Sequence, residues 1–586
     1  MSAKSLAAAA LLALAISPAS GAPAAAIRNP GVYVHLLPRP WLELDPAEAF
    51  DTVSLIPVGN VYESLVTYEN IKHPGRIIPF LASRVPTRAD GLLSADGRIY
   101  RFPIRKDVRF QDGRPLTPQD VRYSILRFML QDGPGGPASL LLEPIFGLSS
   151  TRGPDGRLQL GYKEAAAAVR VEGDDVVVEL KRPSEQFLKV LAALPLVVSR
   201  SWCAEHGEWD GGEASWKRYN GRPDGQSYLD SHMNGTGPFM LETLAPDMLV
   251  LARNPHYWRK PAALSEVYLR VVRNPATRLW MLENGDADSA YLEDQNYEDA
   301  SDISGVRIID PPYHTSLGET LFFTFAIDPA SPYLGSGKLD GDGIPPDFFS
   351  DADVRRGFAA AIDYEGYLRR GLGRRGLRAN SAFPASLLLK QPKVAPRYDI
   401  AAARQDFQRA WGGRLWKRGF TLTLAFNPGS ASRRVLADIL KAGLAKVNPL
   451  FKLRILVLPT ERFYDALEAH RLPLFVDGYD PDYPDPLSMA LGLLYSGGYY
   501  PRAQRFSDPG LDALIEKAET MAGGAQRHDL LRQAIRRAAQ DLPQIYTYNP
   551  TRMRARRSWV VETAPLQNVN NLNLENSPYF YSLSKR

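Results

Sequence analysis

The sequence is poor in features that would define several protein classes. It has a single cysteine, Cys203, so no disulfide can form within the chain. Its eight histidines are scattered without the spacing of metal ligands. The formal charge is only +5, with both signs mixed throughout, whereas nucleic-acid-binding proteins concentrate a stronger positive excess. These absences argue against a disulfide scaffold, a metal centre and a nucleic-acid partner, and they leave apolar burial as the source of stability.

Long hydrophobic runs are also missing, except for a short one at the N-terminus. Lys4 is followed by an apolar run at 6–16, and Pro18 and several small residues then break the run. A run of this length is too short for a membrane-spanning helix but is typical of a secretory signal peptide. We therefore expect residues 1–26 to be a signal peptide and the mature protein to be exported. The three candidate cleavage positions follow Ala22, Ala24 and Ala26.

What the chain does contain is a regular alternation of short strands and helices. In the second half, apolar strands and helices follow one another at 420–426, 432–447, 453–458, 460–469 and 474–479. This β-α-β-α-β order predicts an open α/β sheet. An earlier strand-rich region with its own helices predicts a second α/β unit. Two such lobes would enclose a cleft, which is a preferred place for small-molecule binding.

Several local signals define the scaffold. Thr117 is expected to cap a helix that begins at Pro118. Gly235 and Gly237 are expected where one backbone segment passes close to another. An apolar segment at 545–548 is expected to be a strand that returns the chain to the first lobe.

The chain also carries a series of short motifs. They are LDP at 44–46, NVYESLV at 60–66, IPFLAS at 78–83, YRFPIRKDVRFQDG at 100–113, LTPQDV at 116–121, GTGPF at 235–239, RNPHYW at 253–258, DVRR at 353–356, AID at 361–363 and DPDYPDP at 480–486. In this order they resemble the dipeptide/oligopeptide-binding family of periplasmic solute-binding proteins, also called extracellular solute-binding protein family 5. The likeness covers nearly the whole chain after the predicted signal peptide.

This resemblance implies a fold and a domain order. The expected fold class is α/β: a two-lobed periplasmic-binding-protein fold, type II-like, with an extra subdomain inserted in the first lobe. We expect the first lobe at 27–61 and 196–315, its inserted subdomain at 62–195, the second lobe at 316–543, and a C-terminal return to the first lobe at 544–586.

The resemblance also implies a function. The expected role is capture of a peptide or peptide-like solute for an ABC importer, with the permease and ATPase complex of the inner membrane as partner. The expected location is the periplasm and the expected state a monomer without a cofactor or bound metal. Alternatives within the family are a nickel chelate, haem, an opine or an oligosaccharide as solute, or presentation of the ligand to a sensor.

The DPDYPDP motif at 480–486 is the expected ligand site. Its three carboxylates follow an apolar strand, at the kind of strand end where α/β sheets bind ligands, in a turn that its prolines stiffen. The resemblance gives Asp482 the role of binding a peptide ammonium group, with Asp480 and Asp485 as further candidates. Tyr479 stands where many relatives have tryptophan and offers a stacking surface. The alternative is a solvated turn that caps the next helix.

Three residues of the first lobe are further candidates for the cleft: Tyr33, Tyr62 and Glu63. The alternative for each is ordinary packing. For a peptide carboxylate the likeness is weaker, because dipeptide-type relatives place an arginine where this chain has Asn-Pro-Gly-Ser at 427–430. Arg433 is interpreted as an ordinary residue of a helix start. The arginines at 552, 554, 556 and 557 are interpreted as a solvated strand edge.

A hydrolase is the least favoured alternative, and we expect no catalytic residues. Neither a Gly-x-Ser-x-Gly elbow nor a His-Glu-x-x-His motif occurs in the sequence. Cys203 and His206 are close in sequence, but closeness in sequence does not make a catalytic pair. The acidic loop that begins at Asp340 lacks the oxygen ligands and the glycine that a calcium loop needs.

Overall fold

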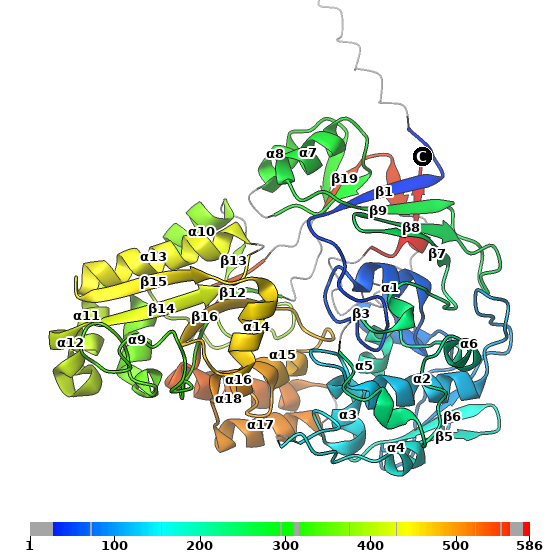
Figure 1. Cartoon of the computed structure of the whole chain (residues 1–586), viewed down its shortest axis with the longest axis horizontal. Coiled ribbons are helices and arrows are strands. Elements are labelled where there is room, and N and C mark those ends of the chain that lie inside the picture. Colours follow the sequence, from blue (N-terminus) through cyan, green and yellow to red (C-terminus); the bar gives the residue numbers. More distant parts are fainter. Residues whose placement is uncertain are drawn as a thin grey trace, which may run out of the picture.

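The computed structural model describes residues 27–586 except 71–72, 154, 224, 294–295, 310–315, 374–375, 429, 522, 551–553 and 563–577. The predicted signal peptide and Arg552 lie outside the described residues. The described chain forms two lobes that lie side by side, and the first and last parts of the sequence belong to the same lobe (Figure 1). No described helix has both the length and the apolar composition that crossing a membrane requires. The predicted two-lobed α/β fold is confirmed.

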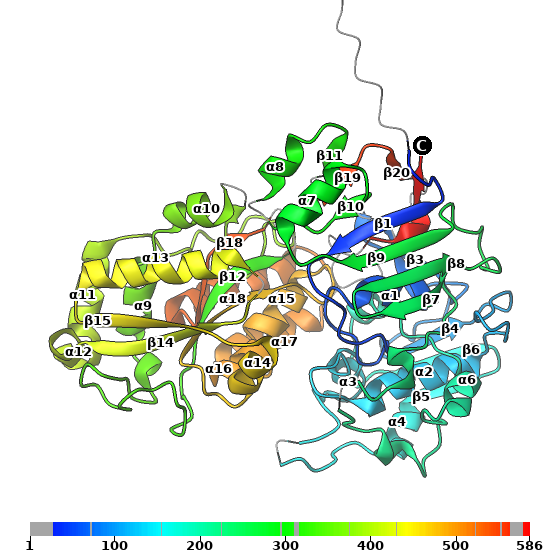
Figure 2. The same ribbon diagram turned by 45° about the horizontal axis from the view of Figure 1, so that its top comes forward.

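Lobe I is built on a seven-stranded sheet. In spatial order its strands are β11 (Val306–Ile309), β19 (Arg554–Arg557), β10 (Ser289–Ala290), β1 (Val32–Leu37), β9 (Glu266–Val271), β8 (Met248–Arg253) and β7 (Phe239–Ala245). β1 is parallel to β9 and β10, and β19 is antiparallel to β10 and β11. The helices of this lobe are α1 (Leu55–Val61), α7 (Pro275–Glu283) and α8 (Tyr297–Ser301), and the hairpin of β20 (Val560–Glu562) and β21 (Leu583–Lys585) ends the chain. α7 and α8 pack against the β10–β11–β19 end of the sheet (Figure 2).

The inserted subdomain lies below this sheet in Figure 1. Its strands are β2 (Val66–Asn70), β3 (His73–Pro79), β4 (Ile99–Pro103), β5 (Val169–Glu172) and β6 (Asp175–Glu179), with β2–β3 as a hairpin and β4–β6–β5 as an antiparallel sheet. Its helices are α2 (Pro118–Gln131), α3 (Ser139–Phe146), α4 (Tyr162–Ala168) and α5 (Phe187–Ala193), and α6 (Arg200–Glu205) follows. Thr117 and Asp120 form a reciprocal capping box at the start of α2, which confirms the predicted cap.

Lobe II contains a five-stranded sheet. In spatial order its strands are β15 (Phe451–Val457), β14 (Phe420–Phe426), β16 (Leu474–Tyr479), β12 (Leu317–Phe323) and β17 (Gln544–Tyr546). One face is covered by helices that include α9 (Ala352–Ala360), α10 (Tyr364–Leu372), α11 (Ile400–Arg409), α12 (Arg414–Arg418) and α13 (Ala431–Val447). The other face is covered by α14 (Thr460–Glu468), α15 (Pro486–Leu493), α16 (Tyr499–Gln504), α17 (Pro509–Glu519) and α18 (Ala525–Asp541). Because both faces are buried, the strands are apolar almost throughout.

The C-terminal return to lobe I begins later than predicted. β17 pairs with β12 inside the lobe II sheet, and its Ile545 is fully buried in the lobe II core. The next strand, β18 (Tyr548–Asn549), pairs with β13 (Leu377–Arg378), also in lobe II. The first strand after these to join lobe I is β19. The expectation that 545–548 returns to the first lobe is therefore wrong, because apolar burial keeps this segment in lobe II.

The glycines of the GTGPF motif stand where two backbone segments meet. A Cβ atom at Gly235 would lie 2.0 Å from the carbonyl oxygen of Val61, and one at Gly237 would lie 2.6 Å from the same oxygen. The Gly237 amide donates to that oxygen at 2.9 Å. No residue with a side chain fits this approach, so the predicted role of these glycines is confirmed.

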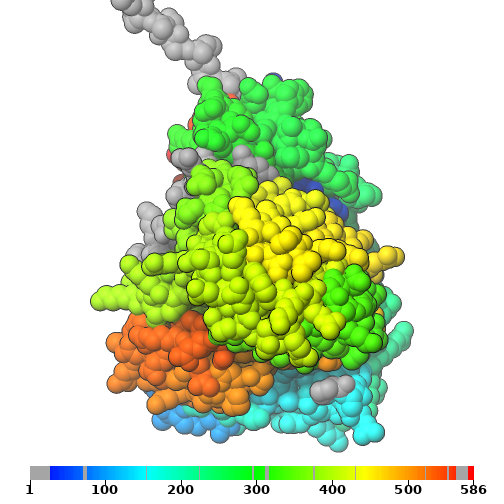
Figure 3. All heavy atoms as spheres, turned by 90° about the vertical axis from the view of Figure 1, so that its left-hand side faces the viewer, coloured from blue at the N-terminus to red at the C-terminus, as the bar shows by residue number. Residues whose placement is uncertain are grey.

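The two lobes are also in contact away from their sheets. Viewed from the outer side of lobe II, the orange helices near the C-terminus lie directly above cyan residues of the inserted subdomain (Figure 3). Arg182 of the insert lies 3.6 Å from Glu519 of α17. Tyr483, from the loop after β16, is buried within the apolar cluster of lobe I.

Candidate functional site

A cavity of about 660 Å³ lies between the lobes. Lobe I contributes residues of β1, β10 and β19, and lobe II contributes the start of β12, the segment after β14, the start of α13 and the end of β16. Its volume falls within the roughly 300–1,000 Å³ that is usual for small-molecule sites. The lobe II contribution stands at the carboxyl ends of the parallel strands β14 and β16, as expected for an open α/β sheet.

The lobe I wall contains a chain of three polar side chains. The Tyr33 hydroxyl donates to Ser289 Oγ at 2.8 Å, and Ser289 Oγ lies 2.7 Å from Nδ1 of His35. Burial and the nearby positive charge of Arg554 lower the pKa of His35 to about 3, and burial raises the pKa of Tyr33 to about 12. Both groups are therefore neutral near pH 7. Of the seven predicted site residues, Tyr33 is the one found among the residues that line this cavity.

The arginines of β19 are part of the same wall. Arg554 and Arg556 line the cavity, and Arg556 lies 3.1 Å from Glu562. Arg557 points to the opposite face, where it is buried and donates to the carbonyl oxygens of Leu282 and Glu283 at the end of α7. The interpretation of this cluster as a solvated edge is therefore wrong for the described residues, since β19 is an interior strand of the sheet. The alternation of the arginines with Ala555 in the sequence marked a two-faced strand, but it did not show what the arginine face covers.

The lobe II wall contains a buried charged group. Arg433, in the first turn of α13, lies 3.1 Å from Asp477 and 3.7 Å from Glu319. Burial alone would raise the pKa of Glu319, but the charge of Arg433 and hydrogen bonds from nearby hydroxyl groups together outweigh burial and hold that pKa low. Asp477 also accepts from the Tyr500 hydroxyl at 2.9 Å. Arg433 is thus not an ordinary residue of a helix start, because its charge faces the cavity and is held by two carboxylates.

The loop that carries Asp482 begins at the cavity and then leaves it. Gly478 lines the cavity, whereas Tyr479, Asp480 and Asp482 are half-buried beyond it. The Tyr479 hydroxyl lies 3.3 Å from Asp482 Oδ2, and the Asp482 amide donates to Ser488 Oγ at 2.8 Å. Burial raises the pKa of Asp482 to about 7, although hydrogen bonds from Tyr479 and Ser488 oppose the rise. A cation bound beside this carboxyl group would favour its charged form and lower that pKa.

Asp485 has a different environment from Asp482. It caps α15 by accepting from the Leu487 amide at 2.9 Å, and it forms ion pairs with Arg527 of α18 and, at 2.6 Å, with Lys189 of α5. Burial alone would raise its pKa, but Lys189 and Arg527 lower it to about 2. Both of its oxygens are committed to these partners. Asp485 therefore joins lobe II to the inserted subdomain and does not face the cavity.

Comparison with known proteins identifies the family. The profile described as "Bacterial extracellular solute-binding proteins, family 5 Middle" matches residues 76–501, which is well over half of the chain. The chain belongs to this family. The resemblance drawn from the sequence motifs is thereby confirmed.

Individual relatives of this family 5 protein are distant but cover most of its length. The dipeptide-binding protein DppE of Bacillus subtilis is 21% identical, with 86% of this chain and 84% of the relative covered. Di/tripeptide-binding protein 2 of Pseudomonas aeruginosa is 23% identical, with 85% and 88% covered. Among solved structures, the Helicobacter pylori periplasmic binding protein DppA in complex with peptide STSA superposes with a TM-score of 0.73 at 18% identity, covering 95% of this chain and 98% of that one. At this identity the superposition shows a shared fold.

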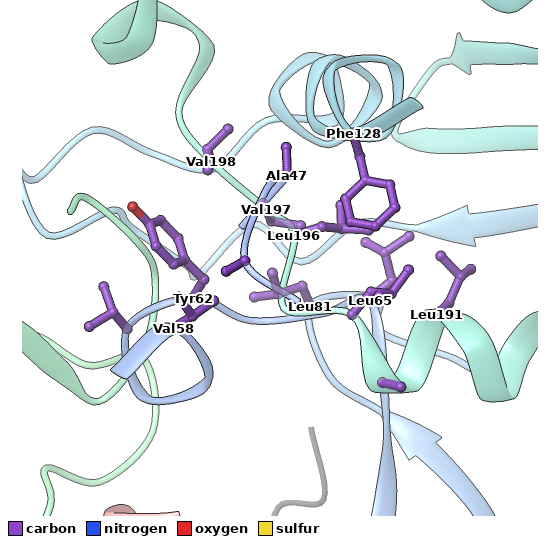
Figure 4. Packing of buried hydrophobic residues seen from close by; sticks show 14 of the residues in the cluster. Ala47, Val58, Tyr62, Leu65, Leu81, Phe128, Leu191, Leu196, Val197 and Val198 are labelled. Carbon is purple, nitrogen blue, oxygen red and sulfur yellow. The ribbon is translucent and has the colours of Figure 1, made fainter. Parts of the chain in front are cut away.

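Two of the predicted cleft residues of this family 5 protein are core residues. Tyr62 is buried among apolar side chains, with Val58 and Leu81 nearby in Figure 4. Glu63 is buried and accepts from the Tyr257 hydroxyl at 2.7 Å, the Thr236 hydroxyl at 2.7 Å and the Trp258 indole at 2.9 Å. Neither residue lines the cavity. The structure thus differs from the expectation for both, because the NVYESLV motif forms the junction of α1 and β2 instead of the cleft wall.

One group of carboxylates in the described residues is compact enough to hold a metal ion. It consists of Glu43, Glu48 and Asp230. Arg222 lies 3.2 Å from Glu48, and Asp230 accepts from two backbone amides. These contacts are typical of a buried ion-pair network that stabilises the lobe, and we assign no metal site here.

Proposed function

We propose that this protein is the periplasmic solute-binding component of an ABC importer and that it captures a peptide or peptide-like solute in the cavity between its lobes. The cavity carries the proposal, since it lies between two separately packed sheets and has walls from both of them. Membership in family 5 supports it, as do the relatives whose names describe peptide binding. The chain passes between the lobes twice, from β11 to β12 and from β18 to β19. Two crossings of this kind are typical of binding proteins that close around a ligand by hinge motion.

Asp482 is proposed to bind the ammonium group of the solute. Its loop starts at the cavity wall, and its half-buried carboxyl group has a hydrogen-bonded oxygen but no arginine or lysine within ion-pair distance among the described residues. A cation from the solute would supply that missing charge. Tyr479 and Asp480 are proposed to border the same subsite. The segment at 427–430 has no arginine, so the carboxylate end of the solute must be bound elsewhere.

Calorimetry with defined peptides tests this proposal. Di-, tri- and tetrapeptides with a free N-terminus are titrated into the mature protein, and each is compared with its N-acetylated form. Asp482→Asn is expected to weaken binding of free peptides by about 10- to 100-fold, since a charged hydrogen bond contributes about 1.5–3 kcal/mol. Asp465→Asn, which removes an exposed carboxylate on α14, is the matched control. Equal affinity of the Asp482→Asn variant and the wild type for free peptides would rule out the assigned role.

Thermal unfolding distinguishes the peptide function from the alternatives. A ligand at 100 times its dissociation constant stabilises the folded state by about 2.7 kcal/mol. The panel therefore includes peptides, a nickel chelate, haem, an opine and an oligosaccharide. If the nickel chelate, haem, the opine or the oligosaccharide stabilises the protein and no peptide does, the peptide assignment is refuted. The protein would then still be a solute-binding protein.

The proposed role requires no bond to be made or broken. The pair formed by Ser289 and His35 has the composition of a hydrolytic dyad, but a histidine with a pKa of about 3 is a poor general base near pH 7. Peptides are expected to be recovered intact after incubation with the protein, as judged by mass spectrometry. Cleavage that is lost in Ser289→Ala would contradict this expectation.

A further inference from the structure

Polar side chains are regularly arranged on the lobe I wall of the cavity. His35 of β1, Ser289 of β10 and Arg556 of β19 are in register across three neighbouring strands. Side chains of a strand alternate between its faces, so Tyr33 shares the face of His35, and Arg554 shares the face of Arg556. All five residues line the cavity. The sheet therefore presents one continuous polar face to the solute.

The opposite face of the same three strands is closed. Leu36, Ala290 and Ala555, the alternate residues of β1, β10 and β19, are buried in an apolar cluster with residues of α7 and α8. These three strands are interior strands of the sheet, so their polar face is not a solvent-exposed sheet edge. The alternation in β19 puts alanine toward the helices and arginines toward the cavity.

The hydrogen-bond chain favours one position for the proton of the His35 ring. Ser289 Oγ accepts from the Tyr33 hydroxyl, and its remaining described contact is with Nδ1 of His35. If Nδ1 also donated to Ser289, the serine hydrogen would have no acceptor among these groups. The arrangement in which every hydrogen of this chain has an acceptor is the one in which Ser289 donates to Nδ1. Because His35 is neutral, its one N–H is on Nε2.

That N–H is directed away from the Tyr33–Ser289 chain. His35 is 8% exposed and lines the cavity, and Nε2 makes no hydrogen bond with any described residue. Because this donor is open to the cavity, a bound solute can accept a hydrogen bond from it. The position calls for a hydrogen-bond acceptor from the bound solute.

The charges of the lining define the class of acceptor. Among the residues that the structure describes, five arginines and four carboxylates line the cavity. Each carboxylate has an arginine within ion-pair distance, and for Glu293 that partner is Arg278, which lies outside the lining. Arg554 and Arg556 stand on the same face of the sheet as His35, and the positive charge of Arg554 is close enough to lower the pKa of His35. An anionic acceptor fits this wall better than a neutral one.

We propose that the lobe I face of β1, β10 and β19 is a carboxylate subsite, in which His35 donates from Nε2 to a carboxylate of the solute and Arg554 supplies the positive charge beside it. This inference rests on the proposed function and names the group that recognises the acidic end of the solute. It places that end on lobe I, opposite the proposed ammonium subsite on lobe II. A solute with both charges would then reach from the lobe I wall toward the Asp482 loop, which begins at the lobe II wall.

Peptide amides test the subsite directly. A peptide that binds is compared with its C-terminal amide by calorimetry. The free acid is expected to bind at least tenfold more tightly than the amide. In His35→Phe and in Arg554→Gln the ratio of the affinity for the acid to the affinity for the amide is expected to fall toward one. His35→Gln, whose side-chain amide can donate from nearly the position of Nε2, is expected to retain part of the preference.

The matched control for Arg554→Gln is Arg454→Gln, which removes the same charge from an exposed position on β15. It is expected to leave the preference unchanged. A preference for the acid that survives in both His35→Phe and Arg554→Gln would overturn the proposal, as would the absence of any preference in the wild type.

A second measurement needs no peptide. Protein with isotope-labelled histidine is titrated with acetate and with acetamide, which differ in charge but little in shape, and the His35 ring is followed by NMR. We expect Nε2 protonated and Nδ1 unprotonated, with a response to acetate that exceeds the response to acetamide and is reduced in Arg554→Gln. A proton on Nδ1, or equal responses to both probes, would refute the subsite. If the protein recognises acetate but binds no peptide, the carboxylate subsite is supported and the proposed peptide function is refuted.

Discussion

The two lobes use their sheets differently. In lobe II both faces of the sheet are covered, with Leu321 and Phe323 on one side and Phe322 on the other. Its cavity-facing groups therefore come from strand ends, loops and the start of α13. In lobe I, at the β1–β10–β19 end, helices cover one face and the other is open to the cavity. A sheet that is covered on both faces can offer a ligand only its ends, whereas a sheet that is covered on one face can offer the other face.

A cavity-creating substitution is expected to have the largest effect in lobe II. Phe322 is fully buried and stacks with Phe475 at 4.9 Å and Tyr500 at 4.2 Å between ring centroids. Phe322→Ala is expected to lower the free energy of unfolding by about 3–5 kcal/mol, measured by urea denaturation. Phe50→Ala, at a side chain that is 37% exposed, is the control and should cost far less. A loss below about 1 kcal/mol for Phe322→Ala would mean that this face of the sheet is not tightly closed.

The contact between the lobes can be broken at Asp485. Asp485→Asn keeps the cap of α15 but leaves Arg527, which is 2% exposed, without its carboxylate. Loss of one partner of a buried ion pair costs about 3–5 kcal/mol. Because folding lowers the pKa of Asp485 to about 2, its stabilising effect is present above about pH 4 and is lost as the pH falls toward 2.

Urea denaturation at several pH values checks this prediction. The wild type should exceed the variant in stability at pH 7, and the difference should shrink as the pH falls below about 4. Asp529→Asn removes a carboxylate that is 63% exposed and paired with Arg532, and it should change stability by less than about 1 kcal/mol. A difference that grows on acidification would contradict the assigned pKa.

The contrast between the lobes also explains what the sequence could predict. In lobe II the apolar strands and intervening helices were located correctly from their pattern, because burial on both faces leaves little ambiguity. In lobe I the polar alternation of β19 is the same for a solvated edge and for a cavity wall. Only the pairing of β19 with β10 and β11, more than 240 residues earlier in the chain, separates the two.

The candidate site was predictable to a smaller extent than the fold. Arg433 could not be recognised, because its partners Glu319 and Asp477 are distant in sequence and join it only when β12, α13 and β16 assemble. His35 gave no local signal either, since its meaning depends on Ser289 across the sheet. The family motif located the Asp482 loop, but it did not separate Asp482 from Asp485, which pairs with Lys189 and Arg527. The role of Asp482 stays a prediction.

The two proposed subsites, the Asp482 loop of lobe II and the His35 wall of lobe I, are expected to differ in their response to pH. Burial raises the pKa of Asp482 to about 7, so below that pH the carboxyl group gains a proton and binds an ammonium group less well. Affinity for a free peptide should fall by about tenfold for each pH unit below 7. The lobe I wall should contribute no such change between pH 5 and 8, because His35 has a pKa of about 3.

Calorimetry between pH 5 and 7.5 checks this difference between the two subsites. The pH dependence should disappear in Asp482→Asn and should be absent for an N-acetylated peptide. It should persist in His35→Phe. A pH dependence that vanishes in His35→Phe and remains in Asp482→Asn would mean that His35, and not Asp482, is the group whose protonation changes binding.

The smallest expected effect comes from Tyr33→Phe. This substitution removes one buried hydrogen bond, to Ser289 at 2.8 Å, and keeps the ring that packs against Phe580. A hydrogen bond of this kind contributes about 0.5–1.5 kcal/mol, so thermal unfolding should show a loss of about 1 kcal/mol. The preference for peptide acid over amide should remain, because Ser289 can still donate to His35. Tyr268→Phe, at a half-buried hydroxyl outside the cavity, is the control. Loss of the acid preference in Tyr33→Phe alone would show that the Tyr33 hydroxyl sets the proton position on His35 or contacts the solute itself.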